Sequence, residues 1–231
     1  MNKKLRTFVY PVCAFIVLLL LWQVCVMLST SEIAFPTPVA VFKEFFYILT
    51  HKVGNYYTVV GHVLWSLSRV LVGFSIAAVF GIILGLTMGW FDYVRAVMMP
   101  IFNLLRPIAP LAWIPLAILW FGIGEKYKYF LIFIAAFVPF TLNAFAGASH
   151  VDKQLVGAAR MLGASKSQLF FEIVVPAAVP SIFSGAQVAL SNSWMTMLAA
   201  EMVCATEGVG WIIIAGQSVN DMTQMIEVGG Q

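Results

Sequence analysis

Long apolar runs, separated by short polar stretches, dominate the pattern along this chain. They cover approximately residues 8–28, 70–90, 97–122, 129–147 and 173–202. A helix that crosses a bilayer needs about 20 predominantly apolar residues, so each run is long enough to span. We therefore expect an all-α membrane protein, a bundle of five to six transmembrane helices that forms one transmembrane domain over residues 1–231.

The composition supports a lipid environment. Hydrophobic residues make up 61% of the chain and charged residues 10%, with a mean hydropathy of +0.94, whereas soluble domains carry about 25% charged residues. A net charge of +3 is too small to indicate nucleic-acid binding. The three cysteines are scattered and form no C-x-x-C pair, so neither a disulfide framework nor a metal site is indicated.

Basic residues set the expected orientation. Lys3, Lys4 and Arg6 precede the first run, which is longer than a signal-peptide core and has no clear cleavage site. The positive-inside rule then places the N-terminus in the cytoplasm. Counting crossings puts residues 148–172 in the cytoplasm, Glu125, Lys126 and Lys128 in a short outer loop, and a helix over 39–49 at the outer surface.

The run over residues 70–90 is rich in glycine. Gly81-x-x-x-Gly85-x-x-x-Gly89 places three glycines on one face of a helix. Because small residues let two backbones approach closely in lipid, this face predicts a tightly packed neighbouring helix.

The run over residues 97–122 is interrupted by prolines. Pro100, Pro107, Pro110 and Pro115 each remove a backbone donor. Broken helices are tolerated in lipid only where protein or a water-filled cavity satisfies the freed carbonyls, so we expect a kinked span that faces the bundle interior. Arg106 at the bilayer centre would cost about 2.5–3.5 kcal/mol. It is either an anchor that reaches the headgroups or an attraction for an anionic solute.

Polar residues also occur within the last long run. Ser191, Asn192, Ser193 and Thr196 lie within one apolar helix, and Asn143 is similar. They serve either hydrogen bonding between helices or the lining of a pathway. Glu201 ends the run and is either a solvated carboxylate or part of a gate.

The moderately polar stretch from Gly157 to Pro176 has its own helix signals. Gly163 interrupts it, and Ser165 with Gln168 three residues later forms a capping-box pattern. We expect two short helices that meet at Gly163 and lie on the cytoplasmic side, between two spans.

This stretch resembles the EAA loop of the membrane subunits of bacterial ABC importers. The matching pattern is Ala158-Ala159-x-x-x-Gly163, nine residues, then Ile173-x-Val175-Pro176. Gly157 stands where the family has glutamate, which removes a carboxylate that could pair with the ATPase.

Other segments resemble the nitrate, sulfonate, taurine and bicarbonate branch of this family. They are L-R-P-I-A-P-L-A-W-I-P-L-A-I-L-W-F-G-I-G from Leu105 to Gly124, the segments 35–38 and 66–70, and the segment from Glu201 to Trp211. The resemblance covers roughly residues 35–215. A sixth span is expected after residue 215 and is not evident, so the chain is expected to be truncated there or to depart from its relatives.

The resemblance implies a permease subunit of an ATP-driven importer, in the bacterial inner membrane. Its implied partners are a second permease copy, a cytoplasmic ATPase dimer that carries ATP and Mg²⁺, and an external solute-binding protein. The chain itself has no G-x-x-x-x-G-K-[ST], so no ATP site or other cofactor is expected in it. The expected ATPase-coupling residues are Gly157, Ala158, Ala159, Gly163, Ile173 and Pro176. The expected translocation path for a small anionic solute comprises Arg106, Trp113, Asn143, Asn192, Thr196 and Glu201.

Two other functions are alternatives to ATP-driven import. A secondary transporter driven by an ion gradient would want an ionisable residue within a span and an internal repeat, and neither is evident. An intramembrane enzyme would need a Ser–His pair, an Asp pair or H-E-x-x-H at depth, and Asp92, Asp152 and Asp221 all fall in expected loops. The sequence therefore favours a transport subunit that is not itself an enzyme.

Overall fold

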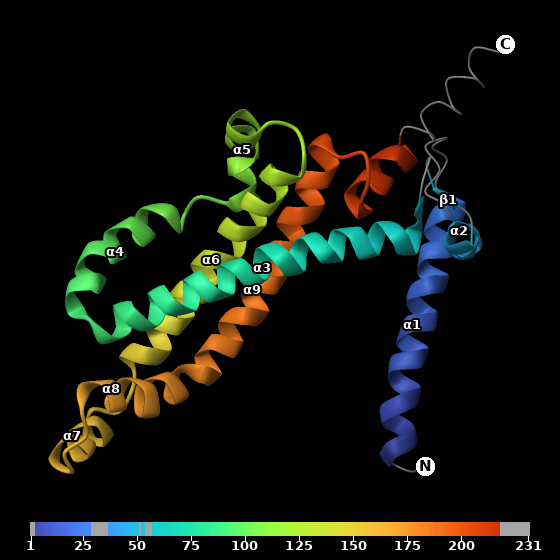
Figure 1. The fold of residues 1–231 in the computed structure, drawn as a ribbon. Helices are drawn as coiled ribbons and strands as arrows, with labels where there is room; N and C mark the ends of the chain where they lie inside the picture. Colours follow the sequence, from blue (N-terminus) through green and yellow to red (C-terminus); the bar gives the residue numbers. More distant parts are fainter. Residues whose placement is uncertain (1–2, 29–36, 51, 54–56, 218–231) are drawn as a thin grey trace. The chain divides into compact units, whose positions relative to one another are not determined.

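The computed structural model describes residues 3–28, 37–50, 52–53 and 57–217. The chain forms two compact units, Met1–Gly61 and His62–Gln231, and each is described by itself. Figure 1 shows the fold, which is helical almost throughout, as the apolar runs predict.

The first unit contains two helices and a small strand pair. α1 covers Lys3–Leu28 and α2 covers Pro38–Thr50, which confirms the helix expected over 39–49. β1 (Lys52–Val53) and β2 (Tyr57–Thr58) pair antiparallel, with Lys52 opposite Thr58. The apolar part of α1 is long enough to cross a membrane.

Three long helices form the body of the second unit. They are α3 (Val59–Trp90), α6 (Glu125–Ser149) and α9 (Val175–Cys204), and they lie side by side in Figure 1. Buried side chains of α3, α6 and α9 meet in successive small clusters along their length. One such cluster joins Ala77, Ala136, Phe140 and Ala189.

The glycines of α3 allow the close packing that their spacing predicts. A methyl group added at Gly81 would lie 2.8 Å from Cβ of Phe140 on α6. One added at Gly85 or Gly89 would overlap Thr141 or Ala148 of the same helix. The prediction of a tightly packed neighbour is confirmed, and this neighbour is α6.

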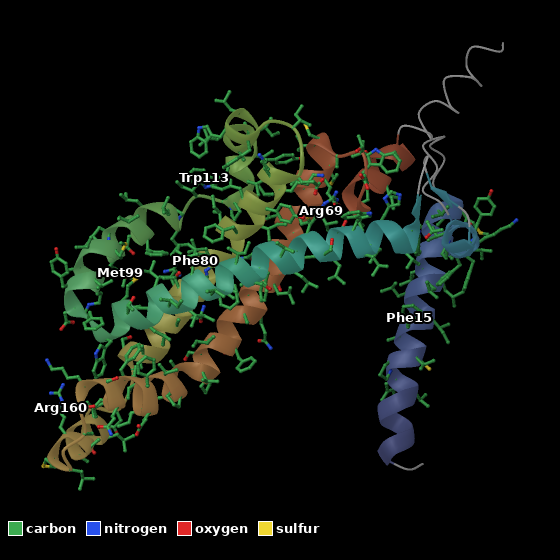
Figure 2. The ribbon with its side chains drawn as sticks, in the orientation of Figure 1. Phe15, Arg69, Phe80, Met99, Trp113 and Arg160 are labelled. Atoms are coloured by element: carbon green, nitrogen blue, oxygen red, sulfur yellow. The ribbon has the colours of Figure 1, made fainter. Side chains whose placement is uncertain are left out.

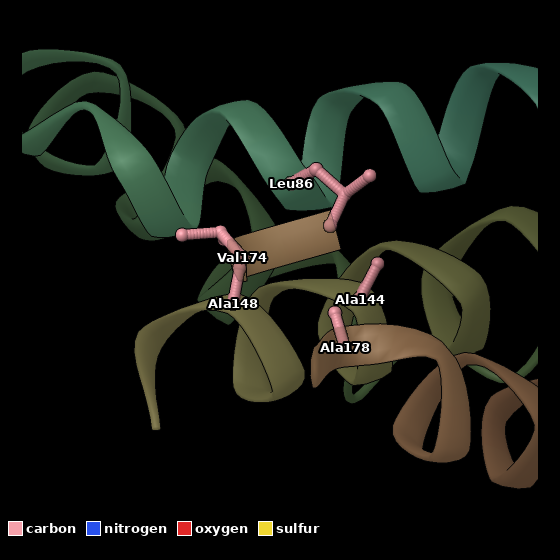
Figure 3. Close-up of a cluster of buried hydrophobic side chains, with 5 residues drawn as sticks. All are labelled: Leu86, Ala144, Ala148, Val174 and Ala178. Carbon is pink, nitrogen blue, oxygen red and sulfur yellow. The ribbon is translucent and has the colours of Figure 1, made fainter. Parts of the chain in front are cut away.

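Small side chains also dominate where α3, α6 and α9 converge near the start of α9. Figure 3 shows Leu86, Ala144, Ala148, Val174 and Ala178 buried against one another. In a bilayer, lipid tails are as apolar as leucine, so close van der Waals contact rather than the hydrophobic effect holds such helices together. Alanine and glycine at these positions make that contact possible.

The proline-rich segment is broken, as expected. α4 (Asp92–Leu105) ends before Pro107, and a short 3₁₀ helix η1 (Pro110–Trp113) leads into α5 (Ile114–Phe121). The two parts are bent by 85° relative to each other. Pro107 and Pro110 cannot donate to a continuing helix, which explains the break.

Two boundaries differ from the expected ones. α3 begins at Val59 rather than near residue 70 and therefore includes Arg69. α6 begins at Glu125, so Glu125, Lys126 and Lys128 form its first turn and not a loop. In both places charged residues suggested a boundary, but ion pairs let the helix include them.

Within the described residues, four helices are long and apolar enough to span a membrane, and the bent pair would make a fifth. The expected fold class, a bundle of five to six apolar spans, is thus confirmed. Residues 209–217 are helical after α9. The rest of the segment in which a sixth span was sought, residues 218–231, lies outside the described residues.

Candidate functional site

A cavity of about 700 Å³ lies between the broken segment, α6 and α9. The break between α4 and η1 forms one side of it, and the middle of α6 forms the opposite side. Figure 2 labels Met99 and Trp113, which belong to the first side. The lining consists of Met99, Asn103, Leu105, Arg106, Ile108, Pro110, Trp113, Phe130, Ile134, Ala135, Phe137, Val138, Pro139, Leu142, Asn143, Val188 and Asn192.

One cation and three amides supply the polar groups of this lining. Arg106 caps the C-terminus of α4, where the last helix carbonyls favour a positive charge. Its side chain is exposed and makes no ion pair within the described part of the chain. Asn103 and Asn192 are also exposed, while Asn143 Nδ2 donates to the Pro139 carbonyl at 2.9 Å. The polar side of the cavity can therefore present donors to an anion.

Apolar and aromatic side chains cover the remaining wall. Phe137 stacks on Phe133 and lies 5.8 Å from Phe102, measured between ring centroids. Trp113 packs against a cluster of buried residues that includes Ile114 and Leu131. These contacts hold the aromatic wall in place by packing that is independent of any solute.

Four of the six residues expected in the translocation path line this one cavity: Arg106, Trp113, Asn143 and Asn192. Thr196 is not among the lining residues and is buried within the bundle. The neighbouring serines lie elsewhere too: Ser191 Oγ donates to the Gln187 carbonyl of its own helix, and Ser193 Oγ is buried without a hydrogen-bond partner among the described residues.

The sixth residue, Glu201, belongs to a separate, buried polar cluster built on Arg69. Arg69 is 2% exposed and Glu201 is 1% exposed. Nη1 of Arg69 donates to Glu201 Oε1 at 3.0 Å, and Nε and Nη2 donate to the two oxygens of Glu125 at 2.5 and 2.7 Å. Lys128 Nζ also donates to Glu125, at 2.8 Å. Two cations and two carboxylates thus join the start of α6 and the end of α9 to α3.

The segment after α9 closes over the same cluster. The backbone N–H of Gly210 donates to Glu201 Oε2 at 3.0 Å, and that of Gly208 donates to His62 Nδ1 at 3.0 Å. Ser66 Oγ donates to Glu201 Oε1 at 2.7 Å and accepts from the N–H of Val209. Gly208 has φ +119°, and a methyl group there would overlap the Glu201 carboxylate. The turn Gly208-Val209-Gly210 (the G-V-G turn) therefore needs glycine so that its backbone can approach the buried Glu201 carboxylate.

Of the alternatives for Glu201, a solvated carboxylate is wrong, because donors from α3 and the G-V-G turn surround the buried side chain. Sequence reasoning also missed Arg69 as a site residue. The signal was present in segment 66–70 and in the segment from Glu201, because an ionisable residue within an apolar helix commonly pairs with an opposite charge. The sequence alone does not show that these two segments are in contact, because Arg69 and Glu201 are 132 positions apart along the chain.

At the opposite end of α9 lies the 157–176 loop (Figure 2, where Arg160 marks it). α7 (Lys153–Met161) starts at Asp152, whose carboxylate accepts from the N–H of Gln154 at 2.7 Å. Two residues after its last residue, Gly163 has φ +86°. The N–H of Gly163 donates to Arg160 O and that of Ala164 to Ala159 O, which is the Schellman motif that favours glycine.

The second helix begins where expected, but it is not a separate short helix, because it runs on into the last span. α8 (Lys166–Gln168) begins at Ser165, and the expected capping box with Gln168 is present. It continues into a π-helical turn, η2 (Leu169–Val174), and then into α9. Pro176 would clash with the carbonyl of residue 172 in an uninterrupted α helix. The wider π turn, in which the Val175 N–H donates to Phe170 O, relieves that clash.

The loop has an inner and an outer face. Ala159 and Ile173 line a hollow of about 570 Å³ between α7 and the start of α9. Leu162 also lines this hollow although it is 89% exposed, and on the outer face Met161 is 86% exposed. Ala158 is exposed, and a side chain at Gly157 would meet no atom within 4 Å. The expected coupling residues thus come together in one helical hairpin that presents apolar side chains outward.

Comparison with known proteins identifies the family to which this chain belongs. The model of the family described as binding-protein-dependent transport system inner membrane component matches residues 77–229. The chain is 36% identical to the taurine transport system permease protein TauC of Escherichia coli, over 83% of this chain and 70% of that protein. It is 39% identical to the nitrate import permease protein NrtB of Synechocystis, over 92% and 80%.

A third relative is the bicarbonate transport system permease protein CmpB of Synechococcus elongatus, 32% identical over 97% of this chain and 83% of that protein. Within the described residues, no three His, Cys, Asp or Glu side chains form a metal-binding group. The family match, the relatives and the bundle of apolar helices agree, and the chain belongs to the family of inner-membrane permease components of binding-protein-dependent ABC transport systems.

Proposed function

We propose that this chain forms the translocation path of an ATP-driven importer for a small anionic solute. The observation that carries the proposal is the cavity at the break of the proline-rich segment, whose lining includes Arg106 with no ion pair to any described residue. Discontinuous membrane helices commonly form solute sites, because their freed backbone groups and cap residues face the solute. The names of the relatives, which refer to taurine, nitrate and bicarbonate, agree with a solute that carries an anionic group.

In this proposal the 157–176 loop docks on a cytoplasmic ATPase dimer that binds ATP and Mg²⁺. Exposed Met161 and Leu162 support this role, because an apolar ridge on a short helix suits a groove on a partner. Rigid contact through α8, η2 and Pro176 would pass movement of the loop to α9. Two copies of the permease would rock around the path, and an external binding protein would deliver the solute.

The proposed orientation follows from the charges. The loop carries Lys153, Arg160 and Lys166, and the positive-inside rule favours a cytoplasmic position for it. The N-terminus is then cytoplasmic as well, and the Arg69 cluster lies at the outer end of the bundle.

Reconstitution of the permease with its ATPase and binding protein in liposomes tests the function. We expect solute uptake that requires ATP on the ATPase side and continues without an ion gradient. Uptake that an ion gradient alone drives, with no effect of ATP, would contradict the proposal and favour a secondary transporter.

Co-purification of the ATPase tests the docking surface. Leu162→Glu is expected to abolish co-purification without unfolding the permease, because this side chain is 89% exposed. A charged residue at Ala159 is expected to act in the same way, whereas one at Gly163 would also strain the backbone, which has φ +86° there. Ile123→Glu is the matched control, an exposed aliphatic residue between α5 and α6. Equal recovery of the ATPase with Leu162→Glu and with the control would show that docking occurs elsewhere.

A further inference from the structure

The hollow between α7 and the start of α9 collects the acidic side chains of the loop. Residues 148–176 contain two carboxylates, Asp152 and Glu172, and both line the hollow. Arg160 and Lys166 belong to the same segment and are not among the described lining residues. The described lining is therefore acidic, although the segment contains more lysine and arginine than aspartate and glutamate.

The two carboxylates differ in how far they are already bound. Oδ1 of Asp152 accepts from the backbone N–H of Gln154 at 2.7 Å, as the N-cap of α7. Glu172, in the π-helical turn η2, is exposed and forms no ion pair within the described part of the chain. Glu172 is therefore the carboxylate available to a cation from outside, and Asp152 adds negative charge to the same lining.

The rest of the hollow is largely apolar. Leu155, Ile173 and Ala177 belong to its lining, and Leu162, which is 89% exposed, lines it where it opens to the surface. An arginine or lysine side chain fits such a lining, because its aliphatic stem packs on apolar surface while its charged head reaches a polar group. A bare metal ion fits less well, since no three His, Cys, Asp or Glu side chains among the described residues form a metal-binding group.

We propose that an arginine or lysine side chain of the cytoplasmic ATPase enters this hollow and pairs with Glu172. The stem of that side chain lies against Leu155 and Ile173, and Asp152 strengthens the attraction. The partner thus inserts a cation into the permease, next to the exposed apolar side chains that the loop offers to the partner. This inference rests on the proposed docking of the loop and names a charged contact within it.

The affinity of the purified ATPase for the full-length permease in nanodiscs tests the pair. Glu172→Gln keeps the shape of the side chain and removes its charge, so it should weaken binding about tenfold. Glu172→Lys should weaken binding further, because like charges repel. Asp92→Asn is the matched control: Asp92 is an exposed carboxylate at the start of α4 that does not line the hollow, and this variant should bind as the natural permease does.

Natural affinity in Glu172→Gln, or an equal loss in Asp92→Asn, would overturn the inference. Salt gives a second readout, which a purely structural role of Glu172 would not change. Binding to the natural permease should weaken as salt is raised, and this dependence should be smaller in Glu172→Gln because one charge pair is missing. An identical salt dependence in the two proteins would also contradict the pair.

Leu162→Glu separates this inference from the proposed docking. If Leu162→Glu abolishes binding of the ATPase while Glu172→Gln leaves the affinity unchanged, the loop docks but its hollow receives no cation. If neither variant changes binding, the docking and the charged contact are both wrong. Reversal of single exposed arginines and lysines of the ATPase to glutamate completes the test: one such variant should bind Glu172→Lys more tightly than the natural ATPase does, and failure of all of them would contradict the pair.

Discussion

Arg69 and Arg106 are both arginines in apolar segments of the same helical bundle, yet their surroundings are opposite. Arg69 is buried and donates to two carboxylates from α6 and α9. Arg106 is exposed in a cavity and has no ion pair within the described part of the chain. A charge removed from water without a partner is costly, so a chain that keeps one must use it structurally or leave it accessible. Arg69 is the first case, and Arg106 is the second.

The largest expected effect is on the buried arginine. Arg69→Met leaves Glu201 buried without its cation, and breaking one side of a buried pair costs about 3–5 kcal/mol. We expect a large fall in the melting temperature of the purified permease, or loss of folded protein. Arg106→Met is the control and should melt within a few degrees of the natural protein. Equal destabilisation by the two variants would remove the distinction between them.

Glu201→Gln comes next in size. The amide retains the shape of the side chain but loses a charged acceptor of hydrogen bonds from Ser66, Arg69 and Gly210. Hydrogen bonds to charged groups contribute about 1.5–3 kcal/mol each, and we expect destabilisation of about that size. Thermal unfolding in detergent measures it. A variant as stable as the natural protein would mean that the charge of Glu201 does not contribute to stability.

Glu125→Gln should have a smaller effect. Although Glu125 accepts from Arg69 and Lys128, its side chain is 45% exposed, and exposed ion pairs contribute about 0.2–1 kcal/mol. Because such pairs are screened, the difference from the natural protein should shrink as salt is raised. A loss as large as that of Arg69→Met, or one that does not depend on salt, would show that Glu125 rather than Glu201 is the main partner.

Local patterns predicted much of this fold. The Gly81-x-x-x-Gly85 face, the break at the prolines and the cap at Ser165 are each specified by neighbouring residues, and the structure has all three. Boundaries marked by charge were wrong, because Arg69 and Glu125 enter helices by pairing with each other.

Local patterns also predicted part of the candidate site. Arg106, Trp113, Asn143 and Asn192 lie in or beside polar or proline-containing interruptions, and they share one cavity. Glu201 looked like a solvated end of a helix because its partners, Ser66 and Arg69, are remote in sequence. Pairing across such distances depends on how the helices pack, which the local pattern does not contain.

The proposed role of Arg106 is to act on the solute, with little contribution to stability. It is tested most directly by ATP-driven uptake with Arg106→Gln and Arg106→Lys, at equal amounts of folded permease in liposomes. We expect melting temperatures close to the natural value in both, uptake reduced about tenfold or more in Arg106→Gln, and partial uptake in Arg106→Lys, which retains the charge without the planar fork. Natural uptake in both variants, or a loss of uptake that only follows a loss of folded protein, would contradict the account.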